Sequence, residues 1–128
     1  MNTVTTDVLI VGAGPSGLAM AALLAREGID AITVTKYGGT AHSPRAHITN
    51  QRTMEVFRDL GMAADITRVA TPNDLMGKNV WATSFAGPEI ARLLTWGSGP
   101  ERHTDYDLAS PCAMVNIPQH VMEPVQLR

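Results

Sequence analysis

The alternation of apolar and polar positions divides the start of the chain into a strand, a helix and a second strand. Residues 7–11 form a nearly continuous apolar run, typical of a parallel strand buried on both faces. Residues 14–27 repeat apolar side chains at helical spacing, and Gly28 is a natural end for that helix. Residues 31–35 form the second apolar run. This order predicts a β-α-β unit and therefore an α/β fold.

Farther along the chain, the pattern changes from helical to strand-like spacing. An apolar stripe that ends at Gly61 predicts a helix, with Asn50 or Thr49 as its N-terminal cap. The other predicted elements are a short helix at 63–69, strands at 79–85, 90–96 and 111–117, a polar loop at 97–107, and a helix from 118 that Pro124 would disturb.

The first helix begins at a glycine-rich loop with the spacing G-x-G-x-x-G. Gly12 permits a sharp turn, Gly14 lets the backbone approach a diphosphate because it lacks a Cβ, and Gly17 allows the helix to pack closely on the strand. Pro15 suits the first helical turn, and Ser16 follows it. Free N–H groups and the positive end of the helix dipole favour phosphate here. The loop therefore predicts a dinucleotide site.

The residue after the second strand departs from the usual dinucleotide pattern. An acidic side chain commonly binds the adenosine ribose about 20 residues beyond the glycines. Thr35 takes that place and is a weaker ribose ligand; Lys36 follows and would either favour a 2′-phosphate, as in NADP, or lie in solvent. Arg45 and Arg52 are further candidates for holding a diphosphate by charge-assisted hydrogen bonds.

Composition limits the classes of function. The 128 residues suffice for one small domain, and a net charge of -2 without a basic run gives no reason to expect nucleic acid as a partner. No apolar run is long enough to span a bilayer, so we expect no membrane partner. Cys112 is the single cysteine, which suits a cytoplasmic protein, and the histidines lack metal-ligand spacing.

Three blocks of the sequence resemble the N-terminal part of single-component FAD-dependent aromatic hydroxylases, the family of phenol and chlorophenol monooxygenases. They span residues 7–18, 44–55 and 118–124. The resemblance implies FAD as cofactor, NAD(P)H and O₂ as co-substrates, and hydroxylation of a phenol to a catechol.

The resemblance also implies roles for individual residues. Arg45 and Gln119 would contact FAD, and the glycine loop would bind its diphosphate. His47 would face the flavin and substrate region and orient a phenol hydroxyl; hydrogen bonding to local backbone is the alternative for this side chain.

The chains of that family are several times longer, so we expect this chain to be an N-terminal portion of such an enzyme. The predicted organisation is the FAD-binding β-α-β portion of a Rossmann-like domain at 1–72, a β-rich segment that starts the substrate domain at 73–117, and a helix returning to the FAD domain at 118–128. The expected partners are a phenolic small molecule and either a second copy of the chain or the remainder of the enzyme. A nicotinamide-dependent dehydrogenase and a non-catalytic nucleotide-binding or interaction fragment are the alternatives.

Overall fold

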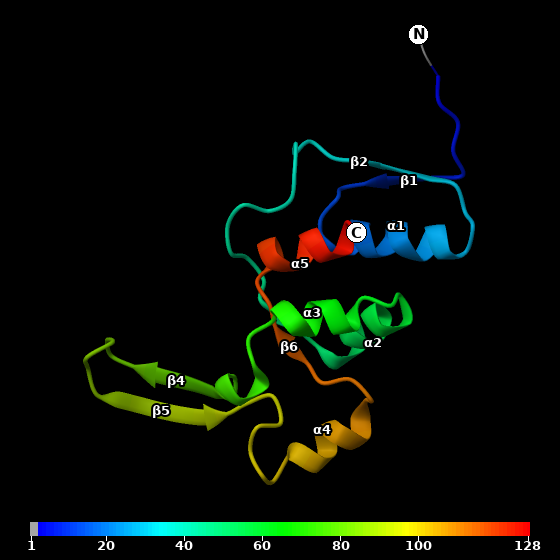
Figure 1. Ribbon diagram of the computed structural model, residues 1–128. Helices are drawn as coiled ribbons and strands as arrows, with labels where there is room; N and C mark the ends of the chain where they lie inside the picture. The colour runs from blue at the N-terminus through cyan, green and yellow to red at the C-terminus, as the bar shows by residue number, and fades with distance from the viewer. Residues whose placement is uncertain (1–2) are drawn as a thin grey trace.

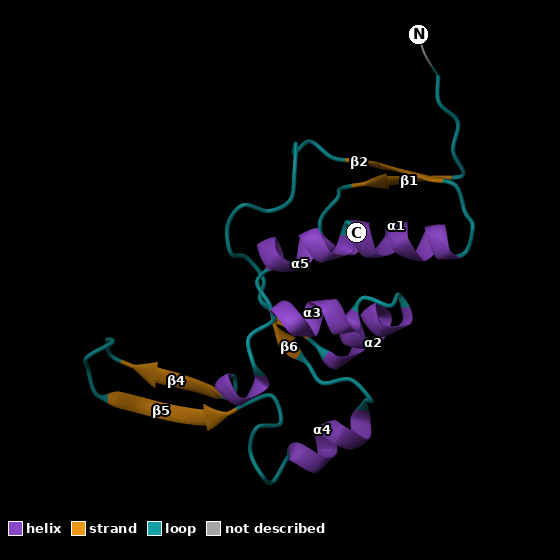
Figure 2. Ribbon diagram, viewed as in Figure 1, coloured by secondary structure: helices purple, strands orange, loops and turns teal. Residues whose placement is uncertain are grey.

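The computed structural model describes residues 3–128, which form helices and three two-stranded sheets, and thereby confirms the α/β class. Figure 1 shows the β1–β2 pair above α1 and α5, with α2 and α3 beneath them, and Figure 2 shows the β4–β5 hairpin projecting from this body. The elements are β1 (Val8–Val11), α1 (Pro15–Arg26), β2 (Ala31–Val34), β3 (Ile48–Thr49), α2 (Gln51–Asp59), α3 (Ala63–Val69), the 3₁₀ turn η1 (Asn73–Leu75), β4 (Lys78–Ala82), β5 (Glu89–Leu94), α4 (His103–Ala109), β6 (Val115–Asn116) and α5 (Gln119–Gln126).

The β1–α1–β2 unit has the predicted parallel pairing. Its register places Val8 opposite Ala31 and continues to the ends of both strands. The prediction that β1 is buried on both faces is wrong for the described residues. Ile10 is buried, whereas Leu9 and Val11 are 58% and 81% exposed. Successive strand residues point to opposite faces, and α1 packs against one face only, so the other apolar face stays open.

The main core lies where α2, α3 and α5 meet β6. Its buried side chains are Met54, Phe57, Ile66, Val115, Ile117, Met122 and Val125. The chain returns to this core because β6 pairs antiparallel with β3. The Ile117 N–H donates to the His47 carbonyl oxygen at 2.7 Å, and the Gln119 N–H donates to the Ala46 carbonyl oxygen at 3.0 Å. These bonds fix the start of α5 beside the segment that precedes α2.

Two predictions about the later elements need correction. The segment predicted as a polar loop at 97–107 ends in helix α4, which begins at His103. Contacts between Arg102 and Asp105, and between His103 and Asp107, join side chains about one turn apart and favour the helix. The strand predicted at 111–117 shortens to the two residues of β6.

The hairpin of β4 and β5, the helices α2 and α3, and the helix after Pro118 are confirmed. Pro124 lies inside α5 without ending it. Its missing N–H removes one hydrogen bond of the helix, and the ring is exposed, so α5 continues to Gln126.

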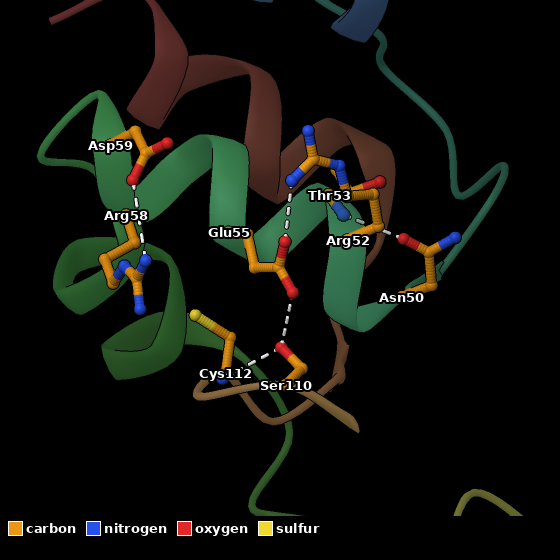
Figure 3. Close-up of polar contacts among 8 residues, drawn as sticks. All are labelled: Asn50, Arg52, Thr53, Glu55, Arg58, Asp59, Ser110 and Cys112. Atoms are coloured by element: carbon orange, nitrogen blue, oxygen red, sulfur yellow. Dashed lines mark hydrogen bonds and ion pairs between the residues drawn. The ribbon is translucent and has the colours of Figure 1, made fainter. Parts of the chain in front are cut away.

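The cap of α2 gives a first testable prediction. Asn50 Oδ1 accepts the Thr53 N–H at 2.8 Å, while Thr49 lies within β3, so Asn50 is the cap (Figure 3). We expect Asn50→Ala to lower the free energy of unfolding by about 1 kcal/mol, because a backbone donor loses its partner. Asn50→Asp keeps an acceptor and should remain near the wild type. Urea denaturation measures both, and equal stability of the alanine variant and the wild type would contradict the assignment.

Candidate functional site

A cavity of about 610 Å³ lies at the carboxyl ends of β1 and β2, beside the first turn of α5. Ligands of open parallel sheets commonly bind at this edge. Three parts of the chain that are distant in sequence form its wall. Its lining residues are Val11, Gly12, Ala13, Gly14, Val34 to Ser43, Arg45, Gln119 and Glu123.

The glycine loop has the geometry that its spacing predicts. Gly12 has a φ of +114°, a conformation that favours glycine, and its N–H donates to the Val34 carbonyl oxygen at 2.8 Å. A Cβ on Gly17 would collide with the carbonyl oxygen of Gly12, so this glycine permits the close contact of helix and loop. A Cβ on Gly14 would meet no atom within 4 Å, and Gly14 lines the cavity. The loop is therefore closely packed against the helix at Gly17, and it leaves open space at Gly14, where it lines the cavity.

The first turn of α1 is available to an anion. Gly14 is the N-cap and provides no side-chain hydrogen bond, and Pro15 opens the helix. The first N–H groups of a helix have no partner within it, and they carry the positive end of the dipole. Pro15, Ser16 and Gly17 do not themselves line the cavity, so their predicted contribution would come from the backbone and shape of this turn.

Two of the predicted cationic side chains reach the cavity, and one does not. Lys36 and Arg45 line it, and neither forms an ion pair among residues 3–128. Arg52 is instead paired with Glu55 at 2.7 Å. Thr35 also lines the cavity, and its hydroxyl accepts the Tyr37 N–H at 3.3 Å. The cavity therefore combines positive side chains with a helix N-terminus, which suits a phosphate-bearing ligand.

Gln119 and Glu123 are the two residues of α5 that line the cavity. Gln119 Nε2 donates to Glu123 Oε1 at 2.6 Å, and the Ala41 N–H donates to Glu123 Oε2 at 2.5 Å. Glu123 is only 2% exposed. Gln119 was predicted as a cofactor contact and Glu123 was not, although the two stand four residues apart, where side chains on a helix meet.

His47 lies outside the cavity lining. Its Nδ1 atom is 3.0 Å from Asn116 Oδ1, across the β3–β6 pair, and the side chain is exposed. The bond is to a neighbouring side chain, whereas the alternative considered from the sequence was a bond to local backbone. The predicted contact of His47 with substrate remains a prediction.

A polar cluster ties α2 to the segment after α4 (Figure 3). The Ser110 hydroxyl donates to Glu55 Oε1 at 2.7 Å, and its oxygen accepts the Cys112 N–H at 3.1 Å. Arg52 donates to the other carboxylate oxygen at 2.7 Å. The hydrogen bond from Ser110, and then that from Arg52, hold the pKa of Glu55 below its usual value of 4.5.

This cluster predicts a pH dependence of stability. Because the pKa of Glu55 is lowered by folding, its contribution is fully present above the unfolded value of 4.5 and is lost as the pH falls through the lower folded value. We expect the stability difference between the wild type and Glu55→Gln to shrink as the pH falls below about 4.5. Urea denaturation at a series of pH values measures this difference, and a constant difference would contradict the assignment.

Within residues 3–128, no group of three or more His, Cys, Asp or Glu side chains is arranged to hold a metal ion. None of the helices in that range combines the length and apolar content that crossing a bilayer requires.

The chain as a whole matches a known protein family. Residues 5–127 match the family model described as FAD binding domain. The chain belongs to the FAD binding domain family. The family match covers the glycine loop, the 35–45 segment and α5, and thus every part of the cavity wall.

Individual members of the FAD binding domain family are similar over nearly the whole chain. The chain is 51% identical to 2,4-dichlorophenol 6-monooxygenase of Delftia acidovorans over 98% of its length, and 51% identical to phenol 2-monooxygenase of Pseudomonas sp. strain EST1001 over 99%. Among solved structures, the flavin-dependent monooxygenase PieE in complex with FAD and substrate aligns with a TM-score of 0.93 and 47% identity over 99% of the chain. The chain spans 22%, 21% and 22% of the lengths of these three proteins.

Proposed function

We propose that the cavity binds FAD and that the chain is part of an enzyme that hydroxylates a phenol to a catechol with NAD(P)H and O₂. The observation that carries the proposal is the convergence of the glycine loop, Arg45 and Gln119 on one cavity. Relatives that are 51% identical over nearly the whole chain are named as phenol-type monooxygenases, which supports a phenolic substrate. The FAD family match favours this proposal over a nicotinamide-dependent dehydrogenase.

The proposed division of roles follows from the chemistry of each wall. The free N–H groups at the start of α1 would hold the diphosphate, and Gly14 would let it approach the backbone. Lys36 and Arg45 would add positive charge, whereas Thr35 would offer a hydroxyl to the adenosine ribose. Gln119 would contact the cofactor from the side of α5.

When bound, FAD would supply the redox chemistry that activates oxygen. The chain's own contribution is to hold that group in place and to position the phenol beside it. His47 is proposed to orient the phenol hydroxyl, with Asn116 fixing the orientation of its ring.

Several finer proposals rest on the sequence. The family resemblance supports NAD(P)H as the reductant. It also supports a protein partner, which would be either a second copy of the chain or the remainder of the enzyme. A cytoplasmic location is proposed from the single cysteine alone.

The test is to load the purified chain with FAD, remove free cofactor by desalting and record the visible spectrum. Retained flavin absorbance is the expected result, and phenol-stimulated oxidation of NAD(P)H would in addition support a working enzyme. Flavin absorbance without turnover would support the FAD site and contradict hydroxylase activity in this chain. Loss of FAD, with a fluorescence change when NADH binds, would overturn the FAD proposal.

A further inference from the structure

Glu123 is a buried acidic side chain that connects two walls of the cavity. Its carboxylate accepts hydrogen bonds from the Ala41 backbone on one oxygen and from the Gln119 side chain on the other. It forms no ion pair among residues 3–128, although it is 2% exposed. Burying a carboxylate is costly unless its oxygens are hydrogen-bonded, so these two donors stabilise its position.

The loop that Glu123 holds has little other hydrogen bonding. Within residues 38–45, the Ala41 N–H is the one backbone group with a hydrogen bond among residues 3–128. Residues 38–43 of this stretch, which we call the 38–43 loop, line the cavity and begin with two adjacent glycines. The bond to Glu123 therefore fixes the loop against α5.

Glu123 also determines which atom of Gln119 is free. A carboxylate accepts hydrogen bonds and cannot donate them, so Gln119 must turn its amide nitrogen toward Glu123. The amide oxygen of Gln119 then remains as an acceptor, and no hydrogen bond among residues 3–128 uses it. Such an acceptor recognises a hydroxyl donor and disfavours phosphate oxygens, which are themselves acceptors.

We infer that Glu123 is a positioning residue that fixes the 38–43 loop and directs the Gln119 amide oxygen toward a sugar or polyol hydroxyl of the ligand. The inference rests on the proposed function, because FAD carries such hydroxyls on its ribose and its ribityl chain. Phosphate recognition would fall to Lys36, Arg45 and Gly14, the N-cap of α1, which also line the cavity.

The decisive experiment first replaces the Glu123 carboxylate by an amide, and then exchanges the acid and the amide between positions 119 and 123. In Glu123→Gln, the new amide oxygen can keep the Ala41 bond, and the new NH₂ faces Gln119, which must then turn its own NH₂ toward the ligand. We expect FAD affinity to fall about 10-fold, as the loss of roughly one hydrogen bond predicts. The double variant Q119E/E123Q restores an acceptor and the original charge, so its affinity should return to within about threefold of the wild type.

Matched controls separate this role from general damage. Glu101→Gln removes an exposed carboxylate outside the cavity and should leave FAD affinity unchanged. Circular-dichroism melting of each variant checks that the fold is retained. Titration with ADP identifies the hydroxyl: equal losses for ADP and FAD indicate the ribose, and a loss confined to FAD indicates the ribityl chain. Unchanged affinity in E123Q, or failure of the double variant to recover, would overturn the positioning role.

A measurement without any ligand distinguishes this inference from the proposed function. In ¹⁵N spectra of the unliganded chain, the Gln119 side-chain amide and the Ala41 backbone amide should both shift in E123Q and stay in place in E101Q. If the wild type does not bind FAD, the proposed function fails, and these resonances still decide whether Glu123 orients Gln119. Unmoved resonances would overturn the inference even if FAD binds.

Discussion

Gly17→Ala is expected to destabilise the chain by about 1–3 kcal/mol, the range found when a methyl group is forced into a packed site. The added Cβ would collide with the carbonyl oxygen of Gly12, and a backbone atom cannot rotate away as a flexible side chain can. Gly12 is itself held by the bond from its N–H to Val34, so the collision would disturb the turn between β1 and α1. The expected damage therefore reaches the whole β1–α1–β2 unit.

Thermal denaturation followed by circular dichroism measures this effect. For a domain of 128 residues, each 1 kcal/mol lowers the melting temperature by roughly 3–6 °C. Gly38→Ala is a matched control, because a Cβ there meets no atom within 4 Å. Equal melting temperatures for Gly17→Ala and the wild type would show that the helix does not pack on the loop as described.

Gly14→Ala is expected to give the opposite result, an intact fold with a large loss of FAD affinity. A Cβ at this position meets no protein atom, and the backbone of Gly14 is in an extended conformation that alanine adopts readily. The methyl group would occupy the space through which a diphosphate approaches the start of α1. We expect the dissociation constant for FAD to rise at least about 10-fold, or roughly 1.4 kcal/mol.

Calorimetric titration of FAD into the wild type and Gly14→Ala tests this expectation, and thermal denaturation of both proteins serves as its control. If Gly14→Ala has the melting temperature of the wild type and also binds FAD with the same affinity, the ligand does not approach Gly14. Together with Gly17→Ala, this variant assigns the two glycines of one loop to different tasks.

The sequence predicted an element of the fold correctly where interactions between residues close in sequence determine that element. The spacing of apolar residues, the glycine loop and the cap at Asn50 concern neighbours in sequence, and each indicated the correct element. The two-sided burial of β1 could not be predicted reliably, because burial depends on which other segments pack on the sheet. Helix α4 was missed because its sequence is mostly polar and carries no apolar stripe, whereas the contacts Arg102–Asp105 and His103–Asp107 become visible only in the structure.

Only part of the candidate site was predicted, because some of its contacts join residues that are distant in sequence. Thr35, Lys36, Arg45 and Gln119 were selected from motifs and do line the cavity, whereas Arg52 points to a carboxylate on its own helix. Glu123 contacts Gln119 on its own helix and also Ala41, 82 positions earlier in the chain, and it is the second contact that fixes the loop. Long-range contacts of this kind leave no local pattern in a sequence.

The most direct test of the FAD site is a titration of the ¹⁵N-labelled chain with FAD, followed by the shifts of its amide resonances. We expect saturable changes in the glycine loop, in residues 35–45 and at the start of α5, with small changes in the β4–β5 hairpin. The absence of saturable changes, or changes concentrated in the hairpin, would contradict the claim that this cavity binds FAD.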